Sequence, residues 1–242
     1  MRYAVFSDIH ANLEALDAVL QACRCQRIDA YLCVGDIVGY GADPAACIDR
    51  TRSVANVIVA GNHDWAVCGQ TDIATFNPFA CAAIEWTRTA LSAPERAFLA
   101  SLPLTFANAD CTLTHGTLHE PEQFHYLTDG FIAWPTFRLL QTTVCFIGHT
   151  HIAGVFMEGA DRQACRISDT AFVAQPGNRY IVNVGSVGQP RDSHPAAAYC
   201  IFDSQELTVN ILRVDYDIAA ARKKIIAAGL PRFLGDRLLS GS

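Results

Sequence analysis

The stretch RYAVFSDIHANLEALDAVLQACRCQRIDAYLCVG, residues 2–35, decides the fold class. Its two apolar runs, at residues 2–6 and 30–35, are typical of buried strands. Between them, residues 12–27 repeat apolar side chains at helical spacing, and Asn12 stands where a helix cap is expected. A strand, a helix and a second strand predict a parallel pair of strands joined by a right-handed crossover.

The same alternation continues along the chain. A helix is predicted at residues 43–52, with Pro44 in its first turn, and a third strand at 56–62. Later segments are predicted as helical (72–101, with breaks around Pro78 and Pro94), paired strands (104–115), a strand (142–151), short antiparallel strands (153–213) and a helix (217–229). No linker divides the sequence, so we expect one α/β domain over residues 1–242, with two sheets and outer helices.

The composition excludes several classes of protein. With 242 residues and 51% hydrophobic content, the chain is long enough to bury a sizeable core. The net charge is -6 and the basic residues are scattered, which argues against a nucleic-acid duplex or an anionic membrane as the main partner. No window holds roughly 18 consecutive apolar residues, so no membrane-spanning helix is expected.

The ten cysteines lie singly in apolar runs such as YLCVGD and TVCFIG, so we expect them to be small buried hydrophobic residues. The absence of a CxxC pair argues against a zinc ribbon or a thioredoxin-type site. Unpaired cysteines of this kind favour a reducing, cytoplasmic environment.

Five short polar signatures come directly after predicted strands. In parallel α/β sheets, ligands bind at the carboxyl ends of the strands, so the five are expected to converge. They are SDIH (Asp8, His10), GDIVGYG (Asp36), GNHD (Asn62, His63, Asp64), LTHG (His115) and GHTH (His149, His151).

Each signature alone is a weak indication of metal binding, but the set together contains two Asp, one Asn and four His as potential ligands. These oxygen and imidazole donors suit manganese, iron, zinc, nickel or cobalt. Seven ligands are too many for one four-coordinate zinc, and they suit two ions that share one carboxylate. In Asp-x-His and His-x-His, an extended chain puts both side chains on one face.

The order DIH, GDIVGYG, GNHD, HG, GHTH resembles the calcineurin-like metallophosphoesterase superfamily, over roughly residues 3–192. GDIVGYGADP and VNVGSVGQPRD further resemble a small bacterial branch of phosphoesterases. The protein-phosphatase branch has an Arg in the block where this chain has Gly39, Tyr40 and Gly41, which argues against protein substrates.

The resemblance implies a four-layer α-β-β-α sandwich and a phosphoester hydrolase, for which we expect a small phosphorylated substrate. It implies two divalent ions: one held by Asp8, His10, Asp36 and His151, and the other by Asp36, Asn62, His115 and His149. A hydroxide that bridges the ions would attack the phosphorus. Phosphodiesters, nucleotides and small phosphomonoesters all remain open as substrates.

Three further residues are candidates for the chemistry. His63 adjoins the ligand Asn62 and is predicted to be the general acid, with Asp64 orienting its ring. Arg191 follows a glycine-rich turn, where it either overhangs the site and binds phosphate or pairs with Asp192 on the surface.

Three other readings stay open. A nucleotide-binding module is weakly indicated by the glycines near residues 35–41, which form neither GxGxxG nor a P-loop. A hydrolase with a single zinc ion would leave some of the seven candidate ligands without a metal to bind. A metal-binding regulatory protein of the same fold would hold the ions with little turnover.

Overall fold

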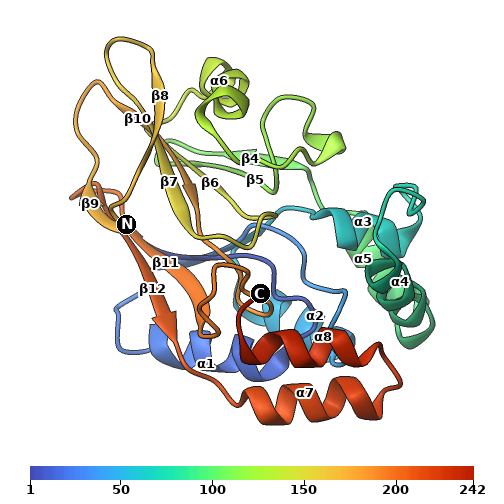
Figure 1. Ribbon diagram of the computed structural model, residues 1–242. Helices are drawn as coiled ribbons and strands as arrows, with labels where there is room; N and C mark the ends of the chain where they lie inside the picture. The colour runs from blue at the N-terminus through green and yellow to red at the C-terminus, as the bar shows by residue number, and fades with distance from the viewer.

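Two six-stranded sheets lie face to face in the computed structural model, which describes residues 1–242, and helices cover the outer faces (Figure 1). The first sheet has the order β3 (Val57–Ile58), β2 (Ala30–Cys33), β1 (Arg2–Phe6), β11 (Ala197–Asp203), β12 (Thr208–Val214), β9 (Ala171–Val173). The second has the order β4 (Thr105–Ala107), β5 (Thr112–Thr114), β6 (Val144–Ile147), β10 (Arg179–Asn183), β7 (Gly154–Glu158), β8 (Ala164–Ile167). The predicted α/β class and four-layer sandwich are confirmed.

The first half of the chain forms the predicted parallel unit. β1 pairs in parallel with β2, and β2 with β3. Helices α1 (Leu13–Cys23) and α2 (Pro44–Val54) make the crossovers. Asn12 caps α1 by accepting a hydrogen bond from the amide of Ala15 at 3.1 Å, as predicted.

Strand alternation separates the apolar side chains into layers. On β1, Tyr3 and Val5 pack between the two sheets, whereas Ala4 and Phe6 face the helices that cover the first sheet. On β6, Phe146 packs between the sheets and Ile147 faces α6 (Gly130–Leu139). Strands buried on both faces explain why these runs are apolar throughout.

The remaining helices are α3 (Asn62–Cys68), α4 (Pro78–Ala90), α5 (Ala93–Ala100), α7 (Ile218–Ala227), α8 (Arg232–Asp236) and the short η1 (Pro121–Gln123) and η2 (Arg237–Leu239). The predicted breaks at Pro78 and Pro94 are helix starts, because proline fits the first turn. The sequence does not predict α6. Pro135 lies inside this helix and Phe131 is exposed, so the regular spacing of buried apolar residues that marks a helix is absent. No helix combines the length and the hydrophobicity that a membrane span requires.

The strands within residues 153–213 pair antiparallel with one another, as predicted, but one of them also has a parallel partner outside this range. β10 lies antiparallel to β7 but parallel to β6. The reason is that the chain leaves β8 for β9 in the other sheet and then returns. The carboxyl ends of β6 and β10 therefore lie at the same edge of the second sheet.

The cysteines are partly as predicted. All ten are free, and six of them are buried, but Cys25 and Cys165 are exposed, which corrects the expectation that all lie in the core. Burial raises the pKa of the Cys23, Cys111 and Cys200 thiols to about 12, because a thiolate is poorly solvated there.

Thiol labelling at neutral pH is expected to modify Cys25 and Cys165 rapidly and the six buried thiols only after denaturation, since the reactive species is the solvated thiolate. Mass spectrometry after a short maleimide pulse identifies the labelled sites. Cys25→Ser and Cys165→Ser together should remove the fast phase. Fast labelling of Cys33 or Cys145 in the native protein would contradict the buried placement.

Candidate metal centre

The five polar signatures lie at strand ends, as predicted. Asp8 and His10 follow β1, and Asp36 follows β2. Asn62 begins α3 after β3. His115 follows β5, and His149 and His151 follow β6 in the second sheet. The facing sheets therefore bring residues separated by up to 141 positions within bonding range, as the Asp8 carboxylate and the His149 amide show at 3.0 Å.

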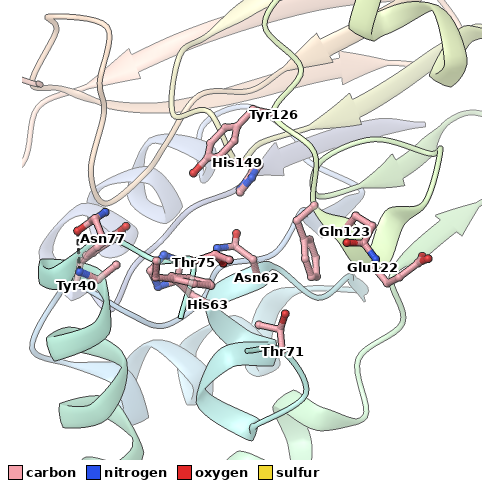
Figure 2. Close-up of a pocket in the computed structure, with 13 residues that line it drawn as sticks. Tyr40, Asn62, His63, Thr71, Thr75, Asn77, Glu122, Gln123, Tyr126 and His149 are labelled. Atoms are coloured by element: carbon pink, nitrogen blue, oxygen red, sulfur yellow. Dashed lines mark hydrogen bonds between the residues drawn. The ribbon is translucent and has the colours of Figure 1, made fainter. Parts of the chain in front are cut away.

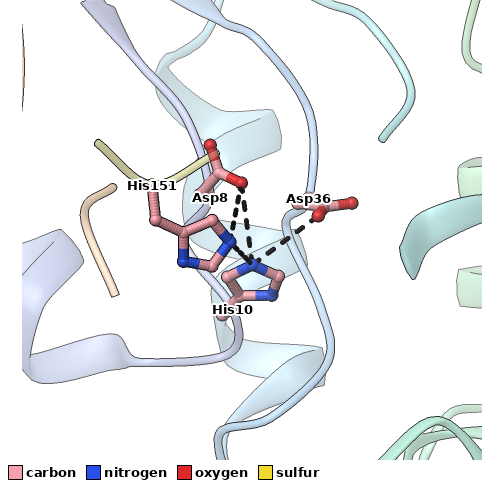
Figure 3. Close-up of side chains that lie close together, drawn as sticks. All are labelled: Asp8, His10, Asp36 and His151. Carbon is pink, nitrogen blue, oxygen red and sulfur yellow. Dashed lines mark hydrogen bonds and ion pairs between the residues drawn. The ribbon is translucent and has the colours of Figure 1, made fainter. Parts of the chain in front are cut away.

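The candidate ligands form two groups that share Asp36. The first contains Asp8, His10, Asp36 and His151, and the second contains Asp36, His115 and His149; within each, the ligand atoms lie within 4.8 Å of one another. Figure 3 shows the first group, in which His151 Nε2 is 3.2 Å from Asp8 Oδ1 and His10 Nε2 is 3.6 Å from Asp36 Oδ2. In the second, His115 Nε2 is 3.2 Å from Asp36 Oδ2.

Backbone carbonyls fix the orientation of three of the imidazoles. Nδ1 of His10, His115 and His151 lies 3.0, 2.7 and 2.6 Å from the carbonyl oxygens of Val38, Val34 and Gln189. Donation from Nδ1 leaves the Nε2 lone pair of a neutral ring directed into the site, the arrangement found for histidine ligands of metals. The Nε2 atoms of His10 and His151 lie only 3.0 Å apart. A cation bound by both lone pairs would stabilise this close approach.

Several buried polar atoms in the centre have no hydrogen-bond partner. They are Asp8 Oδ1, Asn62 Oδ1, His115 Nε2 and His149 Nε2. Unsatisfied buried polar atoms are uncommon in folded proteins and need a reason. Divalent cations would satisfy all four, one at Asp8 in the first group and one at the other three atoms in the second, so the residues present fit the metals that the sequence predicts.

The backbone is strained at the ligand positions. Asp8, Asp36, His149 and His151 have φ values of 53°, 52°, 67° and 60°, in the left-handed region that non-glycine residues rarely adopt. Each such residue costs on the order of 1–3 kcal/mol, and such strain is concentrated at functional sites. Gly61 permits the close approach at Asp36, because a Cβ there would lie 2.1 Å from Asp36 Oδ1.

The charge states suit metal binding. Burial would raise the pKa of Asp36, but the facing imidazoles of His115 and His63 outweigh it and hold this pKa below its usual range. Burial, with the charge of His115, lowers the pKa of His149 to about 3. Burial by itself would lower the pKa of His115, but the negative charge of Asp36 outweighs burial and raises this pKa to about 9. A bound cation would therefore displace a proton from the His115 ring.

A pocket of about 410 Å³ opens beside the second group (Figure 2). Its lining includes Tyr40, the α3 residues Asn62 and His63, Tyr126 and His149, so four segments of the chain border it (Figure 2). The Tyr126 ring stacks on the His149 ring, with centroids 3.9 Å apart. This volume is within the range of small-molecule sites.

The structure brings His63 to the centre but does not bring Asp64 to the His63 ring. The His63 ring lies 4.9 Å from the His10 ring, and its Nδ1 is buried without a partner. Burial lowers the pKa of His63 well below its usual value. The Asp64 carboxylate instead accepts hydrogen bonds from the amides of Ile37 and Gly61, both at 3.0 Å, so the predicted orienting contact is absent.

Arg191 points towards the centre rather than to Asp192. Its guanidinium lies 5.5 Å from the centroid of the Tyr40 ring and donates to Gln189 Oε1 at 2.8 Å. Asp192 pairs with Arg213 instead. Of the two alternatives left open by the sequence, the surface pair is therefore excluded by the geometry.

Sequence reasoning missed Tyr126, Gln189 and Arg237 as neighbours of the centre. Gln189 is buried, and its side chain accepts from both Arg191 and Arg237. Tyr126 lies in a long connection without a motif. The GQPRD block that carries Arg191 was the one available signal for Gln189.

Comparisons with known proteins agree with this geometry. The sequence model of the calcineurin-like phosphoesterase superfamily domain matches residues 1–207. The uncharacterized protein MJ0912 of Methanocaldococcus jannaschii is 38% identical over 98% of this chain and 97% of its own. The crystal structure of a metallophosphoesterase from Sphaerobacter thermophilus has a TM-score of 0.86 and 38% identity, covering 100% of this chain and 99% of the other. The hypothetical protein PH1004 from Pyrococcus horikoshii shares the fold, with a TM-score of 0.80, 18% identity and coverage of 100% and 98%.

Proposed function

The chain belongs to the calcineurin-like phosphoesterase superfamily, and from this premise we propose that it is a dinuclear metal-dependent hydrolase of small phosphorylated substrates. The observation that carries the proposal is the sharing of Asp36 by two groups of ligand atoms. A carboxylate common to both groups is what a pair of adjacent cations requires. Manganese, iron, zinc, nickel and cobalt all suit the donor set.

We assign one ion to Asp8, His10, Asp36 and His151, and the other to Asp36, Asn62, His115 and His149. When bound, two such ions would neutralise the buried carboxylates, attract a phosphate and supply hydroxide near neutral pH. The carbonyls of Val34, Val38 and Gln189 orient the imidazoles, so the ligand shell is preorganised.

His63 is proposed to donate the proton that the leaving oxygen requires. It lines the pocket, and its buried Nδ1 has no partner in the protein. Burial lowers its pKa, whereas the negative charge of a bound phosphate would favour the protonated ring. A ring that is a strong acid once protonated transfers its proton readily to a poor leaving group.

The pocket favours small substrates. Tyr40 and Tyr126 border it, and Arg191 adds a positive charge at its edge, over the Tyr40 ring. Gly39, Tyr40 and Gly41 stand where protein phosphatases have an Arg, which disfavours protein substrates. Phosphodiesters and small phosphomonoesters, nucleotides included, are the substrate classes that we propose.

Chelator-stripped protein is expected to bind two divalent ions per chain on reconstitution and then to hydrolyse nitrophenyl phosphoesters. Elemental analysis and a panel of the five metals against a diester and a monoester measure both properties. A single ion at metal excess would contradict the dinuclear centre. Two ions without turnover of any ester would instead favour the metal-binding regulatory protein.

A further inference from the structure

Two arginines converge on one neutral oxygen beside the metal centre. Gln189 Oε1 accepts from Arg191 Nη2 at 2.8 Å and from Arg237 Nη1 at 3.0 Å. Arg237 belongs to η2, beyond the residues that the family model matches. The two guanidinium groups therefore come from distant parts of the chain and share a single acceptor that carries no charge.

Neither guanidinium forms an ion pair with an Asp or Glu carboxylate. Arg237 Nε donates to an oxygen of Ser242, the last residue of the chain, at 2.5 Å, and its guanidinium lies over the Phe233 ring. By contrast, the partly buried Arg179 and Arg213 each pair with a carboxylate. Burial, and then the positive charge of Arg191, lower the pKa of Arg237 to about 10, so the two cations repel each other.

The pair lies directly beside the candidate ligands. The Arg191 amide donates to the His151 carbonyl at 3.1 Å. The Tyr40 ring beneath the Arg191 guanidinium has its centroid 4.6 Å from that of the His10 ring. An anion held by the two arginines would therefore be a near neighbour of a phosphate at the metal centre.

The C-terminal segment is fixed in this position. Ser193 donates to the Gly241 carbonyl at 2.8 Å, and Arg222 pairs with Asp236 at 2.7 Å. In Figure 1 the red end of the chain returns from α8 towards the middle of the molecule. Holding two like charges together costs free energy, which an anion between them would offset.

We propose that Arg191 and Arg237 form a subsite for a second anionic group of the substrate, a phosphate or a carboxylate. The inference rests on the proposed function, because it places the phosphate to be cleaved at the metal centre. It narrows the substrate class to phosphoesters that carry a further negative group a few bonds from the scissile phosphate.

Calorimetry with manganese-loaded protein tests the subsite with three inert ligands: propylphosphonate, trimethylene diphosphonate and phosphonobutyrate. The wild-type protein is expected to bind one or both of the doubly anionic ligands about tenfold more tightly than propylphosphonate, the effect of a charged hydrogen bond. The diphosphonate and the phosphonobutyrate distinguish a phosphate from a carboxylate as the second group.

Arg237→Gln is expected to abolish this preference and to leave the affinity for propylphosphonate unchanged, whereas Arg237→Lys should retain part of it. Arg232→Gln, in the same segment but exposed and paired with Asp236, is the matched control and should bind as the wild type. Melting temperatures show whether each variant is folded.

The outcomes separate the two proposals. Equal affinity of the wild-type protein for all three ligands, or an equal loss for all three in Arg237→Gln, would overturn the subsite and leave the proposed function standing. A wild-type protein that binds no phosphonate while loaded with metal would overturn both.

Discussion

Asp36→Asn is expected to lower kcat on the order of a thousandfold, with a loss of bound metal. The reason is that Asp36 belongs to both groups of ligand atoms, so its charge acts on both sites. Asn keeps the shape of the side chain and an oxygen that can still accept from the His63 amide, a bond of 2.8 Å in the structure. The change therefore removes charge with little effect on packing.

Asp8→Asn is the matched comparison, because Asp8 is equally buried but belongs to one group alone. Its loss is expected to be smaller, on the order of a hundredfold. Steady-state kinetics are measured together with metal content. Equal losses in the two variants, with unchanged metal content, would show that Asp36 is not shared.

His63→Ala is expected to lower the rate roughly a hundredfold on an alkyl phosphoester, the size of a general-acid contribution, while two ions stay bound. Nitrophenolate leaves without protonation, so the loss on a nitrophenyl ester should be much smaller. The ratio of the two losses is the diagnostic quantity. An equal loss on both esters would show that His63 is not the general acid and instead positions the phosphate or the metal ligands.

The variant Asp64→Asn distinguishes the role of Asp64 from that of its neighbour His63. The Asp64 carboxylate holds the amides of Ile37, Val38 and Gly61, so this variant should lower the melting temperature. It should not change the ratio of rates on alkyl and nitrophenyl esters. A changed ratio would restore the orienting role that the sequence indicated.

The ligand residues were predictable because of strand geometry. Asp8 and Asp36 follow parallel strands of the first sheet, and His149 follows a buried apolar strand of the second; ligands bind at the carboxyl ends of such strands. The sequence shows where strands end, and so it shows which polar residues gather. The left-handed backbone at these positions was not predictable, because tertiary contacts impose it against the preference of the residues.

Adjacency in sequence misled the prediction for Asp64. α3 begins at Asn62, and successive residues on a helix point about 100° apart. Asp64 is in the first turn, where an acidic side chain turns back to the amide of Gly61. His63 therefore faces the pocket while Asp64 faces the loops after β2 and β3.

Arg237 was beyond prediction for a different reason. Its segment, PRFLGDRLLS, carries no motif and follows no strand, so neither spacing nor sheet geometry places it. Its position depends on long-range packing of the C-terminal segment, shown by the bond between Arg237 and Gln189. Contacts of this kind are specified by the whole fold.

The pairing of β1 with β11 has a consequence for synthesis on the ribosome. Residue 2 lies opposite residue 203, so the first strand made receives one of its two neighbours only near the end of translation. Until then its free edge can pair with another nascent chain. Expression at high temperature, or with slowed elongation, is therefore expected to favour aggregation, and chaperones that shield strand edges should increase the yield of folded protein.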